Sequence, residues 1–132
     1  MYSEIKTEKD IQDFLEKTNQ LHDGHIISAI YTYNGIEKTE DGHCYSPWMK
    51  TLTLQVLVTS IFDTVVEIKF ENIFRWSIGC PDEIFFDTVS ITRDGWIVWS
   101  TDVCPDISNI NNVRPENCSF VIAGSMKWRI ID

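Results

Sequence analysis

Residues 21–27, which read Leu-His-Asp-Gly-His-Ile-Ile, hold the densest group of side chains that could do chemistry. His22, Asp23 and His25 supply imidazole and carboxylate groups, which can bind zinc and related ions or transfer a proton. No HExxH-like helical motif turns the two rings toward one point. The alternative is a structural role, in which these residues end a helix, form a turn and begin a strand, with His22 or Asp23 bonded to nearby backbone groups.

His43 and Cys44 are the other pair with catalytic potential. His43 and Asp41 could add ligands to the metal site, and a Cys44 thiolate could act as a nucleophile if a histidine took its proton. Adjacent residues of an extended segment point apart, which favours a loop residue beside a loop thiol. The chain has no Gly-rich phosphate loop. The sequence therefore favours a protein without catalytic activity and predicts no cofactor.

The net charge of the chain limits the classes of molecule that it could bind. The chain has 20 acidic and 11 basic residues, for a formal net charge of −9. Such a field repels nucleic acid and anionic membranes and attracts a basic protein or a cationic ligand. One group of acidic residues could form a negative face for a basic partner, or could be a solvated rim. Its members are Asp82, Glu83, Asp87, Asp94, Asp102 and Asp106.

Trp96 and Trp99 suggest a third kind of site. They lie three residues apart, so on a strand their rings face opposite sides. A ring left exposed could stack on a sugar, bind a small ligand or anchor a protein partner, whereas the helix or a long loop could also cover it.

The length of 132 residues predicts a single domain over 1–132, large enough to fold around one core without disulfides or metal. The polar start of the chain resembles no signal peptide, and no apolar run reaches membrane-spanning length, so we expect a cytoplasmic protein. In that compartment cysteines are free thiols. The four cysteines are widely spaced, at Cys44, Cys80, Cys104 and Cys118.

Hydrophobic periodicity predicts one helix and about six strands. Thr7 is the expected N-cap of an amphipathic helix, and Arg93-Asp94-Gly95 marks a hairpin turn between two apolar runs. Asn72 interrupts the alternation of one long strand and predicts a bulge or bend. The segment between the first two strands reads as a long loop or an irregular hairpin arm. The expected ranges are 7–19 for the helix and 25–33, 50–59, 64–78, 84–92, 96–101 and 119–130 for the strands.

Successive strands without helices between them imply mostly antiparallel pairing. We therefore predict a β-rich α+β fold, a curled sheet or sandwich with the N-terminal helix on one face or edge. The last strand should bury one set of alternate side chains together. That set comprises Phe120, Ile122, Gly124, Met126, Trp128 and Ile130.

Two short motifs carry a family resemblance. Residues 21–26, at the start of a strand, resemble the F/L-H-D opening of several families of small bacterial cytosolic proteins, and residues 68–73 resemble a later strand end in the same families. Some of these families are immunity proteins that accompany polymorphic toxins. The resemblance implies a β-rich domain that binds protein, and transfers no catalytic residue. Together with the charge, it predicts an immunity-type protein, a monomer or homodimer, that masks a basic toxin domain.

Overall fold

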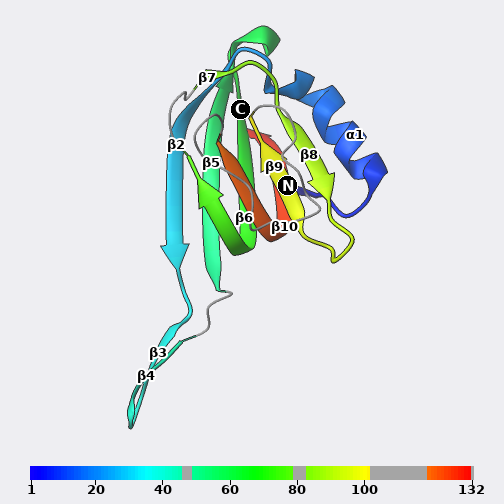
Figure 1. Ribbon diagram of the computed structural model, residues 1–132. Coiled ribbons are helices and arrows are strands. Elements are labelled where there is room, and N and C mark those ends of the chain that lie inside the picture. Colours follow the sequence, from blue (N-terminus) through cyan, green and yellow to red (C-terminus); the bar gives the residue numbers. More distant parts are fainter. Residues whose placement is uncertain (46–48, 79–82, 102–118, 132) are drawn as a thin grey trace.

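The computed structural model describes the whole chain except residues 46–48, 79–82, 102–118 and 132. Its main feature is an eight-stranded antiparallel sheet, strongly curled into a half-barrel, with the α-helix at one end (Figure 1). The strands follow one another in the order β7-β2-β5-β6-β10-β9-β8, and β1 pairs with β10. The predicted β-rich α+β fold is confirmed, as a curled sheet. The strands are β1 Ser3–Glu4, β2 Gly24–Tyr33, β5 Lys50–Val58, β6 Thr64–Ser77, β7 Glu83–Ile84, β8 Thr88–Ile91, β9 Ile97–Ser100 and β10 Phe120–Ile131.

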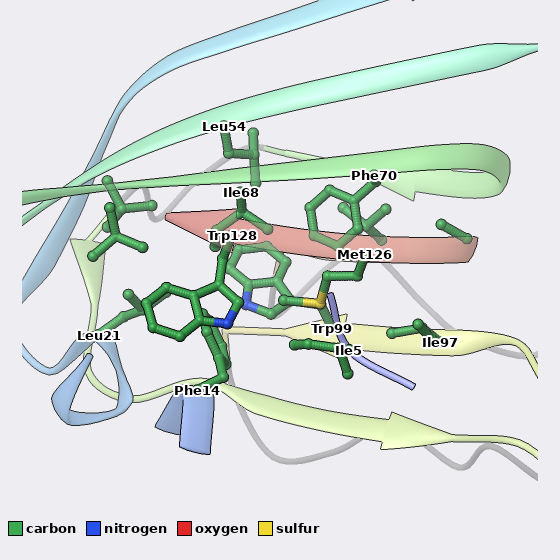
Figure 2. Packing of buried hydrophobic residues seen from close by; sticks show 14 of the residues in the cluster. Ile5, Phe14, Leu21, Leu54, Ile68, Phe70, Ile97, Trp99, Met126 and Trp128 are labelled. Atoms are coloured by element: carbon green, nitrogen blue, oxygen red, sulfur yellow. The ribbon is translucent and has the colours of Figure 1, made fainter. Parts of the chain in front are cut away.

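Helix α1, Glu8–Lys17, begins with a capping box. The Thr7 hydroxyl accepts a hydrogen bond of 3.2 Å from the Asp10 backbone, and the Asp10 carboxylate accepts one of 3.0 Å from the Thr7 backbone. The buried face of the helix carries Ile11 and Phe14. Phe14 packs edge-on against Trp128 of β10, with ring centroids 5.4 Å apart (Figure 2). The helix lies beside β8 and thereby covers that end of the sheet (Figure 1).

Alternation in the central strands builds the main core. In β5 every second residue from Leu52 to Val58 is fully buried, and β6 supplies Phe70 to the same cluster. The Phe70 ring lies 5.9 Å from that of Trp99 in β9 (Figure 2). Large rings therefore fill the inside of the curled sheet, as the aromatic content predicts.

At Asn72 of β6 and Gly124 of β10, the set of alternate side chains that points into the main core changes. Asn72 has a left-handed φ of 56°, and a side chain on Gly124 would place its Cβ 3.1 Å from the Cβ of Asn72. The register between the two strands shifts next to this point. The predicted irregularity at Asn72 is therefore present, and it affects both strands.

As a result, the last strand buries side chains on two faces instead of one. Met126 and Trp128 belong to the main core, whereas Phe120 and Ile122 pack with Val98 in a second cluster. The prediction that these β10 residues share one face is wrong, because the kink at Gly124 moves the alternation by one residue.

The predicted strand 84–92 is two strands. β7 pairs with β2, whereas β8 pairs with β9 at the other end of the sheet. The hairpin turn between β8 and β9 lies where Asp94-Gly95 predicts it, with Gly95 at a φ of 89°.

A second, two-stranded sheet forms an arm beyond the end of β2. Strands β3, Ile36–Thr39, and β4, Gly42–Tyr45, pair with each other and extend away from the main sheet (Figure 1). The segment is thus a hairpin arm, one of the two forms expected for it. Isolated hairpins are marginally stable in water.

Candidate functional site

The chemistry-bearing stretch begins with a left-handed turn. Asn19, Gln20 and Leu21 have φ values of 53°, 54° and 50°, and Asp23 follows at 58°. Left-handed backbone costs L-residues roughly 1–2 kcal/mol each, with asparagine and aspartate the most tolerant. Complete burial of the Leu21 side chain holds the turn in this shape. The turn is therefore a rigid, strained support at the start of β2.

Neighbouring segments brace this turn. The Asn19 amide donates a hydrogen bond of 3.1 Å to the Ser60 hydroxyl, and the Thr59 hydroxyl donates one of 2.9 Å to the carbonyl of Asp23. The backbone N–H of Asp87 donates to the carbonyl of Gln20 at 3.0 Å. The turn thus joins the β5–β6 connection and the segment between β7 and β8.

His22 and Asp23 pair with each other, and His25 stands apart from them. His22 Nδ1 lies 3.2 Å from the Asp23 carboxylate, both side chains are exposed, and the His22 ring lies 5.4 Å from that of Phe85. His25 is exposed on β2, opposite Leu57 and Glu83. Among the residues that the structure describes, no three metal-binding side chains come together.

The other candidates from the sequence fall elsewhere. Asp41 and His43 lie in the exposed hairpin arm, and Cys44 is an exposed free thiol there. Cys80, Cys104 and Cys118 lie outside the described residues, so the state of their thiols stays a prediction.

Gly24 completes the motif for a steric reason. A Cβ at this position would lie 2.7 Å from the carbonyl oxygen of Leu21 and 2.9 Å from a methyl group of Val56. The backbone of the left-handed turn can approach β5 this closely only if residue 24 has no side chain. The motif therefore builds a tight strand start.

From this start, β2 runs as an open edge of the sheet. β7 covers only Gly24 and His25, and within the described chain no strand pairs with the outer side of β2 from Ile26 to Tyr33. Strand β2 contains no Asp, Glu, Lys or Arg. Native proteins usually protect such edges with charges, prolines or a covering element, so an unprotected one is a ready template for another strand.

Apolar side chains lie exposed along the same edge. The exposed fractions are 54% for Ile27, 61% for Ile30 and 41% for Tyr31. Ile36 in the arm and Phe85 beside the strand start are also exposed, at 51% and 69%. We call the segment from Ile26 to Tyr33 the β2 edge. It comprises the unpaired backbone groups on the outer side of the strand and the exposed side chains within this range.

Those members of the predicted acidic face that the structure describes do not lie together on one surface. Glu83 and Asp94 are exposed but lie at opposite ends of the strand order. Asp87 is only 1% exposed, so its assignment to a surface is wrong: it lies between β7 and β8 and is buried against the indole of Trp99. Asp82, Asp102 and Asp106 lie outside the described residues.

Asp87 is instead a buried carboxyl group with a raised pKa. Its Oδ2 accepts a hydrogen bond of 2.8 Å from the Trp99 indole, and its Oδ1 has no hydrogen-bond partner among the residues that the structure describes. Burial raises the pKa of this carboxyl to about 7, although the Trp99 hydrogen bond opposes the rise. The sequence signal for it was weak, namely an aspartate directly after the apolar run Ile84-Phe85-Phe86.

A second carboxylate, Glu67, anchors the N-terminal segment to the outer face of the sheet. It accepts hydrogen bonds from Tyr2 at 2.6 Å, Arg129 at 2.7 Å and Gln55 at 3.2 Å. Burial raises its pKa, but these donors together hold it below its usual value. The Arg129 guanidinium also lies 4.5 Å from the centre of the Tyr2 ring. Both carboxylate oxygens of Glu67 accept hydrogen bonds, which indicates a structural role.

The tryptophans that the structure describes do not form an exposed platform. Trp99 and Trp128 are buried, and Trp76 and Trp96 are partly buried. Trp96 and Trp99 do pack in different clusters, as their spacing predicts. Nothing described here favours the carbohydrate-binding alternative.

A cleft of about 320 Å³ opens between β1 and the β8–β9 turn. Its floor includes Ile5 and Met126, and the charged side chains on its rim pair with each other. Glu4 lies 3.0 Å from Lys6, and Glu71 lies 3.2 Å from Lys127. The charged residues described on its rim are therefore engaged in ion pairs with one another.

Comparisons with known proteins add no family to this picture. No protein-family model, curated protein or solved structure matches the chain. No helix in the described ranges combines the length and apolar character needed to cross a membrane. The resemblance to immunity families consequently stays a prediction.

Proposed function

We propose that this is a non-catalytic protein-binding protein, which recognises an extended protein segment by adding it as a strand to the β2 edge. The observation that carries the proposal is the combination of an unpaired strand side, an uncharged sequence and exposed apolar residues from Ile27 to Tyr31. Strand addition supplies affinity through main-chain hydrogen bonds and selectivity through alternate side chains.

The rest of the molecule supports this role. The left-handed turn and the close approach at Gly24 fix the start of β2, so the edge is ordered before anything binds. A preformed strand loses little conformational entropy on binding. The opposite end of the sheet is covered by α1, which leaves β2 as the side open to a partner within the described sheet.

An immunity-type role, in which the protein masks a basic toxin domain, is one form of this function. The net charge of −9 would speed encounter with a basic partner through its long-range field. Salt would then slow association strongly and affect dissociation less. Replacing the exposed Glu83 and Asp94 by amides would slow association at low ionic strength and leave folding almost unchanged.

The proposal is tested with a library of ten-residue peptides selected for binding to the purified protein. The selected peptides should bind as extended strands, and the affinity should fall at least tenfold when Ile30→Lys places a charge on the edge. Ile130→Lys is the matched control, because Ile130 is also exposed, at 43%, but lies on β10 next to β6.

Melting curves and far-UV circular dichroism should show that both variants fold. If the selected peptides bind the Ile30→Lys variant as tightly as the control, recognition does not use the β2 edge and the proposal fails.

A further inference from the structure

We infer that the β2 edge takes a second copy of this chain. The two β2 strands pair antiparallel about a twofold axis and join two curled sheets into one continuous sheet. The inference rests on the proposed function, that the edge binds an extended segment, and names the partner.

Charge is the first argument. Two copies with a net charge of −9 repel each other, so they can meet closely only where the surface carries no acidic side chains. Strand β2 has none over its ten residues, and its one histidine, His25, lies in the part that β7 already covers. The β2 edge is therefore a neutral, apolar strip suited to a like-charged copy.

Geometry is the second argument, and together with the exposure of Ile30 it favours one register. The strand has an irregularity between Ile26 and Ser28, so its regular open part runs from Ser28 to Tyr33. Across a twofold axis, opposed residues of antiparallel strands lie on the same face. An axis at Ile30 pairs Ser28 with Thr32 and Ala29 with Tyr31 of the other copy. It also places the two Ile30 side chains, the most exposed of the large apolar side chains of β2, against each other.

Closure is the third argument. A twofold contact of one edge with itself uses the same surface on both copies, so assembly stops at two. At the far end of the sheet α1 lies against β8, which hinders growth into a fibre.

Light scattering during size-exclusion chromatography tests the inference directly. The wild-type protein should have twice the chain mass of 15.3 kDa at high concentration and dissociate on dilution. Ile30→Lys should be monomeric, whereas Ile130→Lys should remain dimeric. Salt should strengthen the dimer, because it screens repulsion between like-charged copies, whereas it would weaken a complex with a basic protein.

Cross-linking tests the register. In a Cys44→Ser background, Ile30→Cys should form an intermolecular disulfide under mild oxidation, since directly opposed residues of a strand pair are close enough for the bond. The background protein and its Ile130→Cys variant serve as controls. Cross-linking of Ile30→Cys no faster than of Ile130→Cys would overturn the proposed pairing.

The result also separates the inference from the proposed function. The wild-type protein could be monomeric at every concentration and still bind library peptides in a way that Ile30→Lys abolishes. That result would overturn the proposed dimer and support the proposed function. A monomer that binds no peptide through β2 overturns both.

Discussion

The Trp99 indole nitrogen lies 2.8 Å from Oδ2 of Asp87, and both side chains are shielded from solvent. Within the described part of the chain, the second carboxylate oxygen of Asp87 has no hydrogen-bond partner. Burial disfavours the ionised form and raises the pKa of this carboxyl to about 7. Among the described residues, Asp87 is the one whose pKa departs furthest from its usual value.

The stability of the protein should therefore fall as the pH rises. The pKa of Asp87 is about 7 in the folded chain and near 3.8 when exposed, so between these values the folded state retains a proton that the unfolded state has lost. This difference in pKa corresponds to at most roughly 4 kcal/mol of unfolding free energy. That contribution is lost as the pH rises from 4 to 7, and above pH 7 the unfolding free energy no longer changes through Asp87. Urea unfolding at several pH values measures the slope.

Asp87→Asn should flatten that slope, because the amide does not titrate. Asp94→Asn is the control, since Asp94 is exposed in the β8–β9 turn and should leave the slope as it is. Equal slopes for the wild type and Asp87→Asn would show that Asp87 is ionised throughout.

Gly24→Ala should destabilise the protein by about 1–3 kcal/mol, because the added methyl group meets the Leu21 carbonyl and Val56 in a region that cannot expand freely. Gly124→Ala should cost less, since its closest contact, to Asn72, is 3.1 Å. Chemical denaturation of both variants gives the comparison. The reverse order would mean that the turn at residues 19–21 yields more readily than the β6–β10 kink.

Trp128→Ala should destabilise by about 3–5 kcal/mol, because it removes a buried ring that packs on Phe14. Lys127→Ala, one position along the strand, should change stability by about 1 kcal/mol or less. It loses only a partly exposed ion pair with Glu71 and a contact with the Tyr2 ring. Similar losses in the two variants would contradict the alternation of this half of β10.

Tyr2→Phe should cost about 1 kcal/mol at neutral pH, because Glu67 loses one of its hydrogen-bond donors. The donors lower the pKa of Glu67, so their contribution is present above the unfolded pKa and disappears as the pH falls through the lower folded value. Denaturation at neutral and at strongly acidic pH should show the difference shrinking. A difference independent of pH would place the effect in ring packing instead.

Zinc should not raise the melting temperature, since His22, Asp23 and His25 do not converge with a further ligand among the described residues. A ligand that binds only the folded state would raise it in proportion to its binding free energy. A saturable one-to-one shift, abolished by His22→Ala or His25→Ala, would restore the metal-binding alternative.

The sequence predicted well those features that depend on local alternation. The β5 pattern from Leu52 to Val58 reports burial directly, and the Asp94-Gly95 turn is specified by its own two residues. Thr7 and Asp10 similarly identify the helix start. In each case the residues that carry the signal are the residues that form the structure.

Features that depend on distant segments could not be predicted in this way. The burial of Asp87 arises because Trp99 and the turn at Gln20 meet it across the core. The face change in β10 requires Gly124 to lie against Asn72 of another strand. Likewise, the openness of β2 is a property of the strand order, in which short β7 covers only its first two residues.

Strand β10 occupies the middle of the sheet although it is the last of these elements in the sequence. It pairs with β6 on one side and with β9 and β1 on the other. During synthesis on the ribosome, the apolar faces of β5 and β6 therefore emerge long before the strand that completes their sheet. The core cannot close until the residues after Phe120 have left the exit tunnel, and until then the exposed apolar faces are prone to aggregate.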